Sequence, residues 1–174
     1  NDNDVKIPYV NSCLTPDLAI LDPMLIEGIN EPLMAEFMAD IFAHAAESSV
    51  SKLSNAYIKQ IAKSSMELLL EAANEMKSSR AAKALEKLMF AGHIAGMAQS
   101  NAFVGCCHAL AHALEGKLRL RHGQALLSVI KPCLEWHRHK LKLKEYDYYL
   151  DAYEKLGIGK YADKGLIGKI EDGQ

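Results

Sequence analysis

The chain has 174 residues, 49% of them hydrophobic, which suffices for one domain with a buried core. Its formal net charge of −2 at pH 7 lacks the basic surplus of a nucleic-acid-binding protein. No apolar run approaches the roughly 18 residues of a membrane helix, and the first residues lack a signal-peptide pattern. We therefore expect a soluble cytoplasmic protein whose partners include no nucleic acid and no membrane.

Residues 1–30 are predicted to be extended or irregular. Three prolines interrupt this stretch, and two short apolar segments within it, residues 5–10 and 18–21, have the composition of short strands. Asn30 is a suitable N-cap for a first helix, and Pro32 is tolerated in a first helical turn. The chain is therefore expected to change from an extended segment to a helical region at about residue 31.

Apolar residues recur at steps of three and four from this point onward, which predicts an all-α bundle of about six helices. The predicted helices span residues 32–48 and 53–77, a third that begins after a capping Ser78 or Ser79 and carries an apolar stripe to Ala98, and residues 102–114, 123–139 and 144–156. Gly92 and Gly96 in the third helix are expected to allow close approach of a neighbouring helix. A G-x-G-x-x-A segment begins at Gly157, but the preceding residues are predicted to be helical, so it lacks the strand that a dinucleotide fingerprint requires.

Histidine spacing is the most informative feature of the chain. His108 and His112 are four residues apart and share a helix face, and His122 follows a short stretch, residues 116–121, that is predicted to be non-helical. Asp40 and His44 form a second pair at the same spacing. One carboxylate with three imidazoles suits Fe²⁺ or Zn²⁺ better than Ca²⁺ or Mg²⁺, which prefer oxygen ligands.

Four motifs together resemble the iron-dependent alcohol dehydrogenases over roughly residues 8–136. They are D-x-x-x-H-A-x-E at residues 40–47, A-G-x-x-A-G-M-A-x-S-N-A at 91–102, G-x-x-H-A-x-A-H-A-L at 105–114, and H-G at 122–123. The resemblance implies the helical, dehydroquinate synthase-like C-terminal domain of that family. It implies metal ligands at Asp40, His44, His108 and His122, with His112 near the metal and the nicotinamide as a candidate catalytic group for proton relay.

The resemblance further implies that residues 1–30 lead from a nucleotide-binding domain absent from this chain, and that residues 31–174 form a metal-binding domain truncated at its C-terminal end. The intact enzyme would exchange a hydride between NAD(P)H and a small alcohol or aldehyde, with Fe²⁺ or Zn²⁺ as Lewis acid. The intact enzyme is also a candidate homo-oligomer, and this chain alone would be inactive.

Three positions depart from the family pattern. Met38 and Ala39 replace a Gly-Met pair, Arg121 replaces a proline before the last histidine, and Glu115 stands where a small residue is usual. These changes are expected to bear on the shape of the substrate pocket and on cofactor approach more than on metal binding.

Two other functions stay open at this level. The chain could be a non-catalytic helical module for metal binding or interaction, or part of a metal-dependent lyase related to dehydroquinate synthase, whose ligands include a glutamate. His93, His137 and His139 match no ligand position and are expected at the surface or in the core. The four cysteines show no C-x-x-C spacing, so we expect reduced thiols, with Cys106 and Cys107 as small apolar residues beside the ligand helix.

Overall fold

The all-α prediction is confirmed. The computed structural model describes residues 9, 11–79, 81–163 and 165–166, and over these it contains six α-helices, three short 3-10 helices and no strand. The α-helices are α1 (Glu31–Val50), α2 (Ala56–Met76), α3 (Ala82–Ala102), α4 (Cys106–Leu118), α5 (His122–Leu141) and α6 (Lys144–Leu156). The 3-10 helices are η2 (Ser12–Leu14), η3 (Pro23–Ile26) and η4 (Ile158–Tyr161).

The segment before α1 contains no regular strand where it is described. Residues 18–21 were a predicted strand, but they form no secondary structure, because no neighbouring strand offers them backbone partners. The other predicted strand, residues 5–10, lies outside the described residues apart from Tyr9. Asn11 and Asp22 instead cap η2 and η3 with their side chains.

The predicted start of α1 is confirmed, whereas that of α3 is wrong. The Asn30 side chain accepts a hydrogen bond of 3.0 Å from the backbone N–H of Leu33, and Pro32 lies in the first turn. The N-cap of α3 is Ala81, whose side chain offers no acceptor. Ser78 donates to the carbonyl of Glu75 at 2.9 Å, so its hydroxyl completes the end of α2 and caps nothing in α3.

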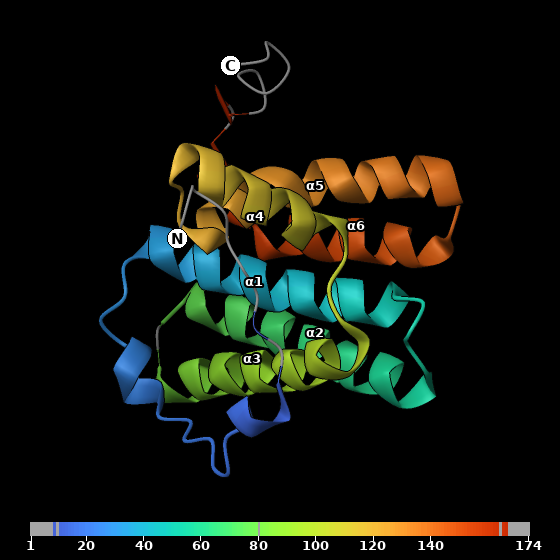
Figure 1. Ribbon diagram of the computed structural model, residues 1–174. Helices are drawn as coiled ribbons and strands as arrows, with labels where there is room; N and C mark the ends of the chain where they lie inside the picture. The colour runs from blue at the N-terminus through green and yellow to red at the C-terminus, as the bar shows by residue number, and fades with distance from the viewer. Residues whose placement is uncertain (1–8, 10, 80, 164, 167–174) are drawn as a thin grey trace.

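Helix α1 is the centre of the molecule. It packs against α2 and α3 on one side and against α5, with further contacts to α4 and α6, on the other. Figure 1 shows the result as α1 lying between a lower layer of α2 and α3 and an upper layer of α4, α5 and α6. A helix surrounded in this way must be apolar over most of its circumference, and the many buried alanines and methionines of α1 meet that requirement.

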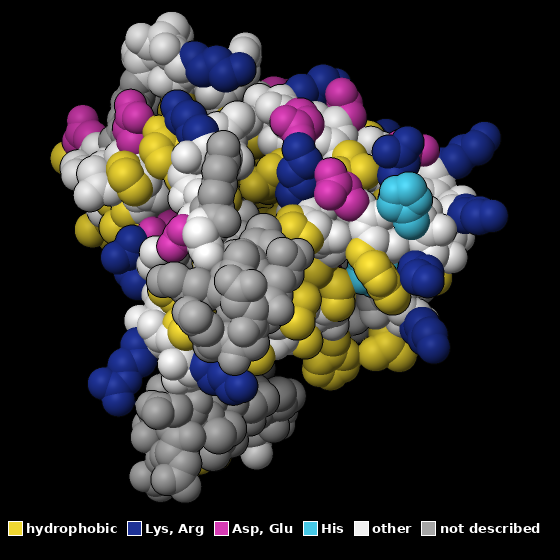
Figure 2. Space-filling model, turned by 90° about the horizontal axis from the view of Figure 1, so that it is seen from above, with side chains coloured by type: hydrophobic (Ala, Val, Ile, Leu, Met, Phe, Trp, Pro, Cys, Tyr) yellow, Lys and Arg dark blue, Asp and Glu magenta, His cyan; other side chains and the backbone are white. Residues whose placement is uncertain are grey.

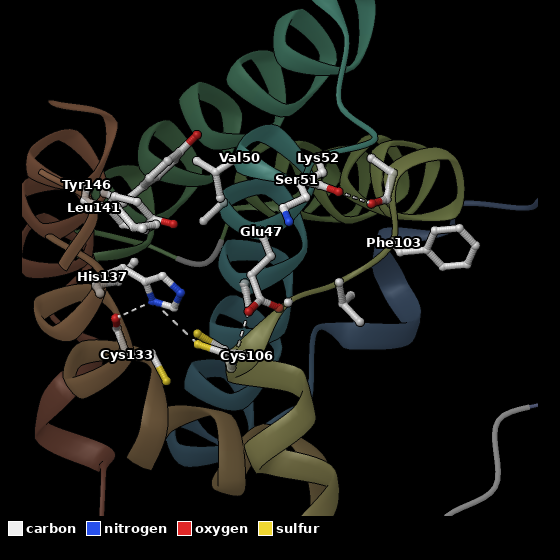
Figure 3. A pocket seen from close by; sticks show the side chains of 18 of the residues that line it. Glu47, Val50, Ser51, Lys52, Phe103, Cys106, Cys133, His137, Leu141 and Tyr146 are labelled. Carbon is white, nitrogen blue, oxygen red and sulfur yellow. Dashed lines mark hydrogen bonds between the residues drawn. The ribbon is translucent and has the colours of Figure 1, made fainter. Parts of the chain in front are cut away.

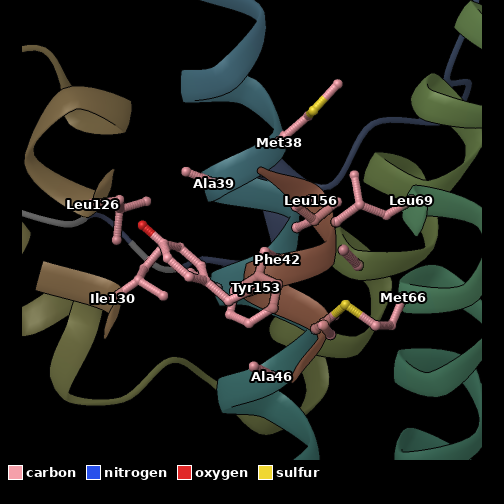
Figure 4. Close-up of a cluster of buried hydrophobic side chains, with 14 of the residues drawn as sticks. Met38, Ala39, Phe42, Ala46, Met66, Leu69, Leu126, Ile130, Tyr153 and Leu156 are labelled. Carbon is pink, nitrogen blue, oxygen red and sulfur yellow. The ribbon is translucent and has the colours of Figure 1, made fainter. Parts of the chain in front are cut away.

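The core is densest around Phe42 of α1, whose side chain is fully buried. Its ring meets the rings of Tyr149 and Tyr153 of α6 edge to face, with centroids 6.3 and 5.7 Å apart. Met66 and Leu69 of α2 close the other side of this cluster (Figure 4). The apolar stripe predicted for α2 is therefore confirmed as its buried face.

Small residues bring α3 close to its neighbours, although only one of the two predicted glycines does so. A Cβ atom added at Gly92 would lie 3.3 Å from Cδ1 of Ile41, so this glycine does allow α1 to approach closely. A Cβ at Gly96 would meet nothing within 4 Å, and the expectation for that residue is wrong. The buried alanines of α3 form the rest of the contact face: Ala84, Ala91, Ala95, Ala98 and Ala102.

The surface carries mixed charge. Figure 2 shows Lys and Arg side chains along several edges of one face, with carboxylates and apolar side chains among them. The basic side chains between residues 138 and 144 are exposed, as expected for a solvated run, and Arg138 pairs with Asp147 at 2.7 Å. No helix in the described part of the chain combines the length and the apolar character that a bilayer span requires.

Candidate metal centre

Four side chains singled out in the sequence meet at one point. The Oδ1 atom of Asp40 lies 3.7 Å from Nε2 of His44, 3.5 Å from Nε2 of His108 and 3.2 Å from Nε2 of His122. The rings of His44 and His108 are stacked with centroids 4.6 Å apart, and the His122 ring is 5.3 Å from that of His108. Three imidazole nitrogens therefore surround a single carboxylate oxygen.

These side chains reach this point from three different helices. Asp40 and His44 are one turn apart on α1, His108 lies in the first turn of α4, and His122 is the first residue of α5. Gly123 sets the position of His122, because a Cβ atom there would lie 2.4 Å from Cβ and 2.8 Å from the backbone oxygen of Glu36. Only a glycine lets the start of α5 rest on the backbone of α1.

The cluster fits a metal ion by two observations. Asp40 Oδ1 and His108 Nε2 are buried atoms with no hydrogen-bond partner among the described residues, which is costly unless something else satisfies them. Two ligand atoms that are each about 2.1 Å from one ion, at a tetrahedral angle, lie about 3.4 Å apart. The separations of 3.2–3.7 Å around Asp40 match that value.

A second carboxylate orients His108 from behind. Oε2 of Glu47 accepts a hydrogen bond of 2.7 Å from Nδ1 of His108, so Nδ1 carries a proton and Nε2 is the nitrogen that faces Asp40 and can bind an ion once it is deprotonated. Oε1 of Glu47 accepts from the backbone N–H of Cys107 at 2.6 Å, which satisfies one orphan donor at the start of α4. The N-cap of α4 is Gly105, where a Cβ would lie 2.8 Å from this oxygen. Glu47 thus fixes both the imidazole and the helix that carries it.

Two of the departures from the family pattern bear on the start of α5, and one of them contacts the site. Glu115 accepts a hydrogen bond from Nδ1 of His122, and this leaves Nε2 of His122 directed at Asp40. Arg121 donates from Nε to Oε2 of Glu36 at 3.0 Å, with a second bond between the same side chains. These residues hold the start of α5. Met38 and Ala39, in contrast, are buried in the core (Figure 4), so that departure bears on the packing of α1.

Burial and neighbouring charges shift the pKa values of the side chains in the cluster. Burial alone would raise the pKa of Asp40, but the close imidazoles of His108, His122 and His44 hold that pKa well below its usual range. Burial would lower the pKa of His108, but Asp40 and Glu47 together raise it to about 9. Burial is the largest influence on His44 and lowers its pKa. The Glu47 carboxyl pKa is also lowered: burial opposes this, and bonds from His108 and the Gly105 backbone outweigh burial.

His112 lies beside the cluster and not within it. Its ring is half-buried, with its centroid 5.3 Å from that of His122 and 6.1 Å from that of His108. Its nitrogen belongs to a separate group with Glu115 and His122. This position at the edge of the site is consistent with the separate role that the resemblance implies for it.

The path of the chain to His122 differs from the prediction in one respect. Helix α4 spans Cys106–Leu118 and includes a buried Gly116, so the predicted non-helical stretch is shortened to three residues. The helix ends because Arg119 adopts a left-handed conformation, with φ 53°. At the other end, residues 102–105 are not part of α4, since Phe103 has φ 61° and ends α3.

The sequence motifs include Glu47 and Glu115, but the sequence did not predict that these carboxylates orient His108 and His122. Glu47 is seven residues after Asp40, two turns along the same face of α1, and that spacing was the available signal. Glu115 is one turn after His112 on α4, but its bond to His122 depends on the turn that follows, which no spacing reveals.

The chain matches the model of the Fe-containing alcohol dehydrogenase family, C-terminal, over residues 34–158. It belongs to the iron-containing alcohol dehydrogenase family. The matched region contains all six α-helices except for the first residues of α1, and it includes every side chain of the candidate metal centre.

Similar proteins are alcohol and aldehyde dehydrogenases. The chain is 36% identical over 179 residues to the bifunctional aldehyde-alcohol dehydrogenase AdhE of Escherichia coli K12, covering 95% of this chain and 20% of that protein. It is 32% identical to aldehyde-alcohol dehydrogenase 2 of Entamoeba histolytica over 136 residues, which are 78% of this chain and 15% of that protein. The chain thus spans a fifth or less of the length of these two relatives.

A solved structure supports the fold. An archaeal halo-thermophilic alcohol dehydrogenase from a Red Sea brine pool superposes with a TM-score of 0.77 at 20% identity, over 90% of this chain and 46% of that chain. At this identity the likeness concerns the fold alone.

Proposed function

We propose that this chain is the metal-binding catalytic domain of an NAD(P)-dependent alcohol dehydrogenase or aldehyde reductase. The observation that carries the proposal is the group of three imidazole nitrogens within 3.7 Å of Asp40 Oδ1, which lies inside a region matched by the family model. Asp40, His44, His108 and His122 are the proposed ligands of Fe²⁺ or Zn²⁺, and membership of the family favours Fe²⁺. A bound ion supplies Lewis-acid polarisation of an aldehyde carbonyl and stabilisation of the alkoxide of an alcohol.

The protein groups around the ligands hold them in a single geometry. Glu47 and Glu115 keep Nδ1 of His108 and His122 protonated, so that both Nε2 lone pairs converge on the site. The side chains of Asp40, His44 and His122 are 33%, 22% and 27% exposed, whereas that of His108 is 3% exposed. The site is therefore closed on the His108 side and open on the opposite side, where a substrate oxygen would enter.

His112 is the proposed proton-transfer group. It is half-buried at the edge of the site, next to His122, and imidazole exchanges protons near neutral pH. In this role it would pass a proton between solvent and the alcohol oxygen as the hydride moves. The hydride itself belongs to NAD(P)H, for which we propose a further domain preceding residue 31 in the intact enzyme, with residues 1–30 leading from it.

The proposal also bears on the two alternatives. The cluster around Asp40 contains no glutamate, in contrast to the ligand set of the lyase alternative, since Glu47 and Glu115 bond to the far nitrogens of the imidazoles. A purely structural or interaction module would have no reason to leave Asp40 Oδ1 and His108 Nε2 buried without partners.

Metal analysis tests the proposal directly. The chain purified anaerobically with Fe²⁺ should retain about one ion, and the double variant His108→Ala/His122→Ala should retain none at this site, because two of the four ligands are gone. The matched control is His93→Ala/His139→Ala, which removes two histidines outside the cluster and should retain the ion. Equal iron content in the wild type and in His108→Ala/His122→Ala would overturn the proposal.

Activity needs the intact enzyme. With the nucleotide-binding domain present, NAD(P)H-dependent aldehyde reduction should be lost in His122→Ala and retained in His93→Ala. For His112→Ala, iron content should stay at the wild-type level while turnover falls, which separates a proton-transfer role from ligation.

A further inference from the structure

Three of the four cysteines gather at a second place in the fold. The Sγ atoms of Cys106, Cys107 and Cys133 all lie within 4.8 Å of one another. Cys106 and Cys107 are the first two residues of α4, and Cys133 comes from the middle of α5. Figure 3 shows Cys106 and Cys133 facing each other across the gap between these helices. We call this group the thiol cluster.

An imidazole and a cavity border the thiol cluster. Nδ1 of His137 lies 3.6 Å from Sγ of Cys106, and it is 2.8 Å from the carbonyl oxygen of Cys133 (Figure 3). The His137 ring is held in place by stacking on Tyr146, with centroids 5.2 Å apart. The cluster lines a cavity of about 490 Å³ that also reaches Glu47 and Tyr149. An ion can therefore reach the sulfurs, and water can complete its coordination.

Packing alone does not account for this arrangement. Cys107 and Cys133 are buried and Cys106 is half-buried, so the sulfurs could serve as small apolar groups, but such a role does not require three of them to converge beside an imidazole. The described residues near the cluster thus offer three soft sulfur ligands within reach of one ion.

We propose that Cys106, Cys107 and Cys133 form a second metal site, a three-thiolate site for Zn²⁺. Two sulfurs bound to one zinc at about 2.3 Å each, at a tetrahedral angle, are about 3.8 Å apart, so the observed spacing needs only a small contraction. Thiolates select soft and borderline ions, whereas the nitrogen and oxygen ligands around Asp40 suit Fe²⁺. Binding releases to the solvent one proton for each thiol that is protonated beforehand, and no oxidation or reduction takes place.

The two sites would lie back to back at the start of α4. The backbone N–H of Cys107 donates to Glu47, and Glu47 in turn accepts from His108. The ligand atoms are nevertheless separate, so occupation of the thiol cluster does not depend on the function proposed above. Each site can fail its test without the other.

Cadmium is a suitable probe, because Cd²⁺ bound by thiolates has an ultraviolet charge-transfer absorption that nitrogen and oxygen ligands do not produce. Titration of the reduced, metal-free chain with Cd²⁺ should give this absorption with an end point near one ion per chain. Cys133→Ser should lose most of it. The matched control Cys13→Ser removes an exposed cysteine and should leave it unchanged. Asp40→Asn should also leave it unchanged, because that variant damages only the other site.

Two results would overturn the proposal. One is the absence of thiolate absorption from the wild type, and the other is equal absorption in Cys133→Ser and the wild type. Should Cys133→Ser fail to fold, as circular dichroism would show, cadmium NMR of the wild type decides the question without any variant. A resonance at the chemical shift of cadmium with three sulfur ligands supports the site, and resonances of nitrogen and oxygen coordination alone exclude it.

Discussion

Helix α1 contributes to two regions, one apolar and one charged. Around Phe42 its side chains meet apolar partners from α2 and α6, and the contacts are fully buried (Figure 4). Around Asp40, barely one turn away, it presents a charge to three imidazoles and leaves buried polar atoms without partners. The first region stabilises the fold through area removed from water, whereas the second costs stability until a cation occupies it. The difference separates a region that stabilises the fold from one that we propose to bind a metal ion.

Truncation of the core should separate the two regions most strongly. Leu69 is fully buried on α2, a helix that carries none of the proposed ligands, so Leu69→Ala should lower the free energy of unfolding of the metal-free chain by about 2–5 kcal/mol. Urea unfolding followed by circular dichroism measures this. Iron affinity should change little under native conditions, and Leu53→Ala, at an exposed position, should cost under about 0.5 kcal/mol. Equal losses in the two variants would contradict this division.

The charged region should make metal binding depend on pH. The raised pKa of His108, about 9, means that this imidazole carries a proton at pH 7 in the metal-free chain, and binding must displace it. Affinity should therefore rise about tenfold per pH unit between pH 7 and 9 and then level off. Calorimetry in buffers of different ionisation enthalpy should detect the released proton at pH 7. Binding without proton release at pH 7 would refute the assignment of His108.

Loss of the carboxylate behind His108 should weaken the site without removing a ligand. In Glu47→Gln a single amide oxygen faces two donors, Nδ1 of His108 and the N–H of Cys107, so one of them is left opposite an NH₂ group. We expect metal affinity to fall about 10–100-fold. Competition with a chelator measures this, and Glu67→Gln on the exposed face of α2 is the control. Unchanged affinity would show that Glu47 serves the helix start alone.

The contact between α1 and α5 connects the two regions. A Cβ at Gly123 would lie 2.4 Å from Cβ of Glu36, so Gly123→Ala should force α5 away from α1 and cost about 1–3 kcal/mol of stability. Gly96→Ala is the matched substitution in open space, and it should stabilise α3 by about 0.5–1 kcal/mol. Thermal unfolding compares them. Stabilisation by both substitutions would mean that the close approach at Gly123 is not required.

The sequence predicted the helices well because each buries one face. The steps of three and four in α2 and α3 correspond to their buried stripes, and the predicted bounds of α6 are those observed. Helix ends set by backbone conformation were harder to predict. Phe103 and Arg119 adopt conformations with positive φ that favour glycine, and neither residue type signals such a turn, so α4 was predicted with the right length but four residues too early.

The site was predictable in part. Spacing put Asp40 with His44 and His108 with His112, but the meeting of the two pairs was implied by the family resemblance alone. The distance between the two pairs depends on helix packing, such as the close contact of Gly123 with Glu36. No local sequence pattern contains this information. The thiol cluster was missed for the same reason, since Cys133 is 26 residues after Cys107 and meets it only through the packing of α5 on α4.

Because α1 is enclosed by the other helices, the side chains of the proposed site are held in place before an ion binds. Asp40, His44 and Glu47 all belong to α1. Phe42 and its neighbours pack this helix on several sides, so α1 cannot rotate about its axis without opening the core. Rotation by a single residue, about 100°, would point both carboxylates into hydrocarbon. Ion capture would then require no folding step, in contrast to small zinc modules that are unstructured without metal. The conformational entropy of aligning the ligand atoms is already lost when the domain folds. An arriving cation therefore binds a preorganised site.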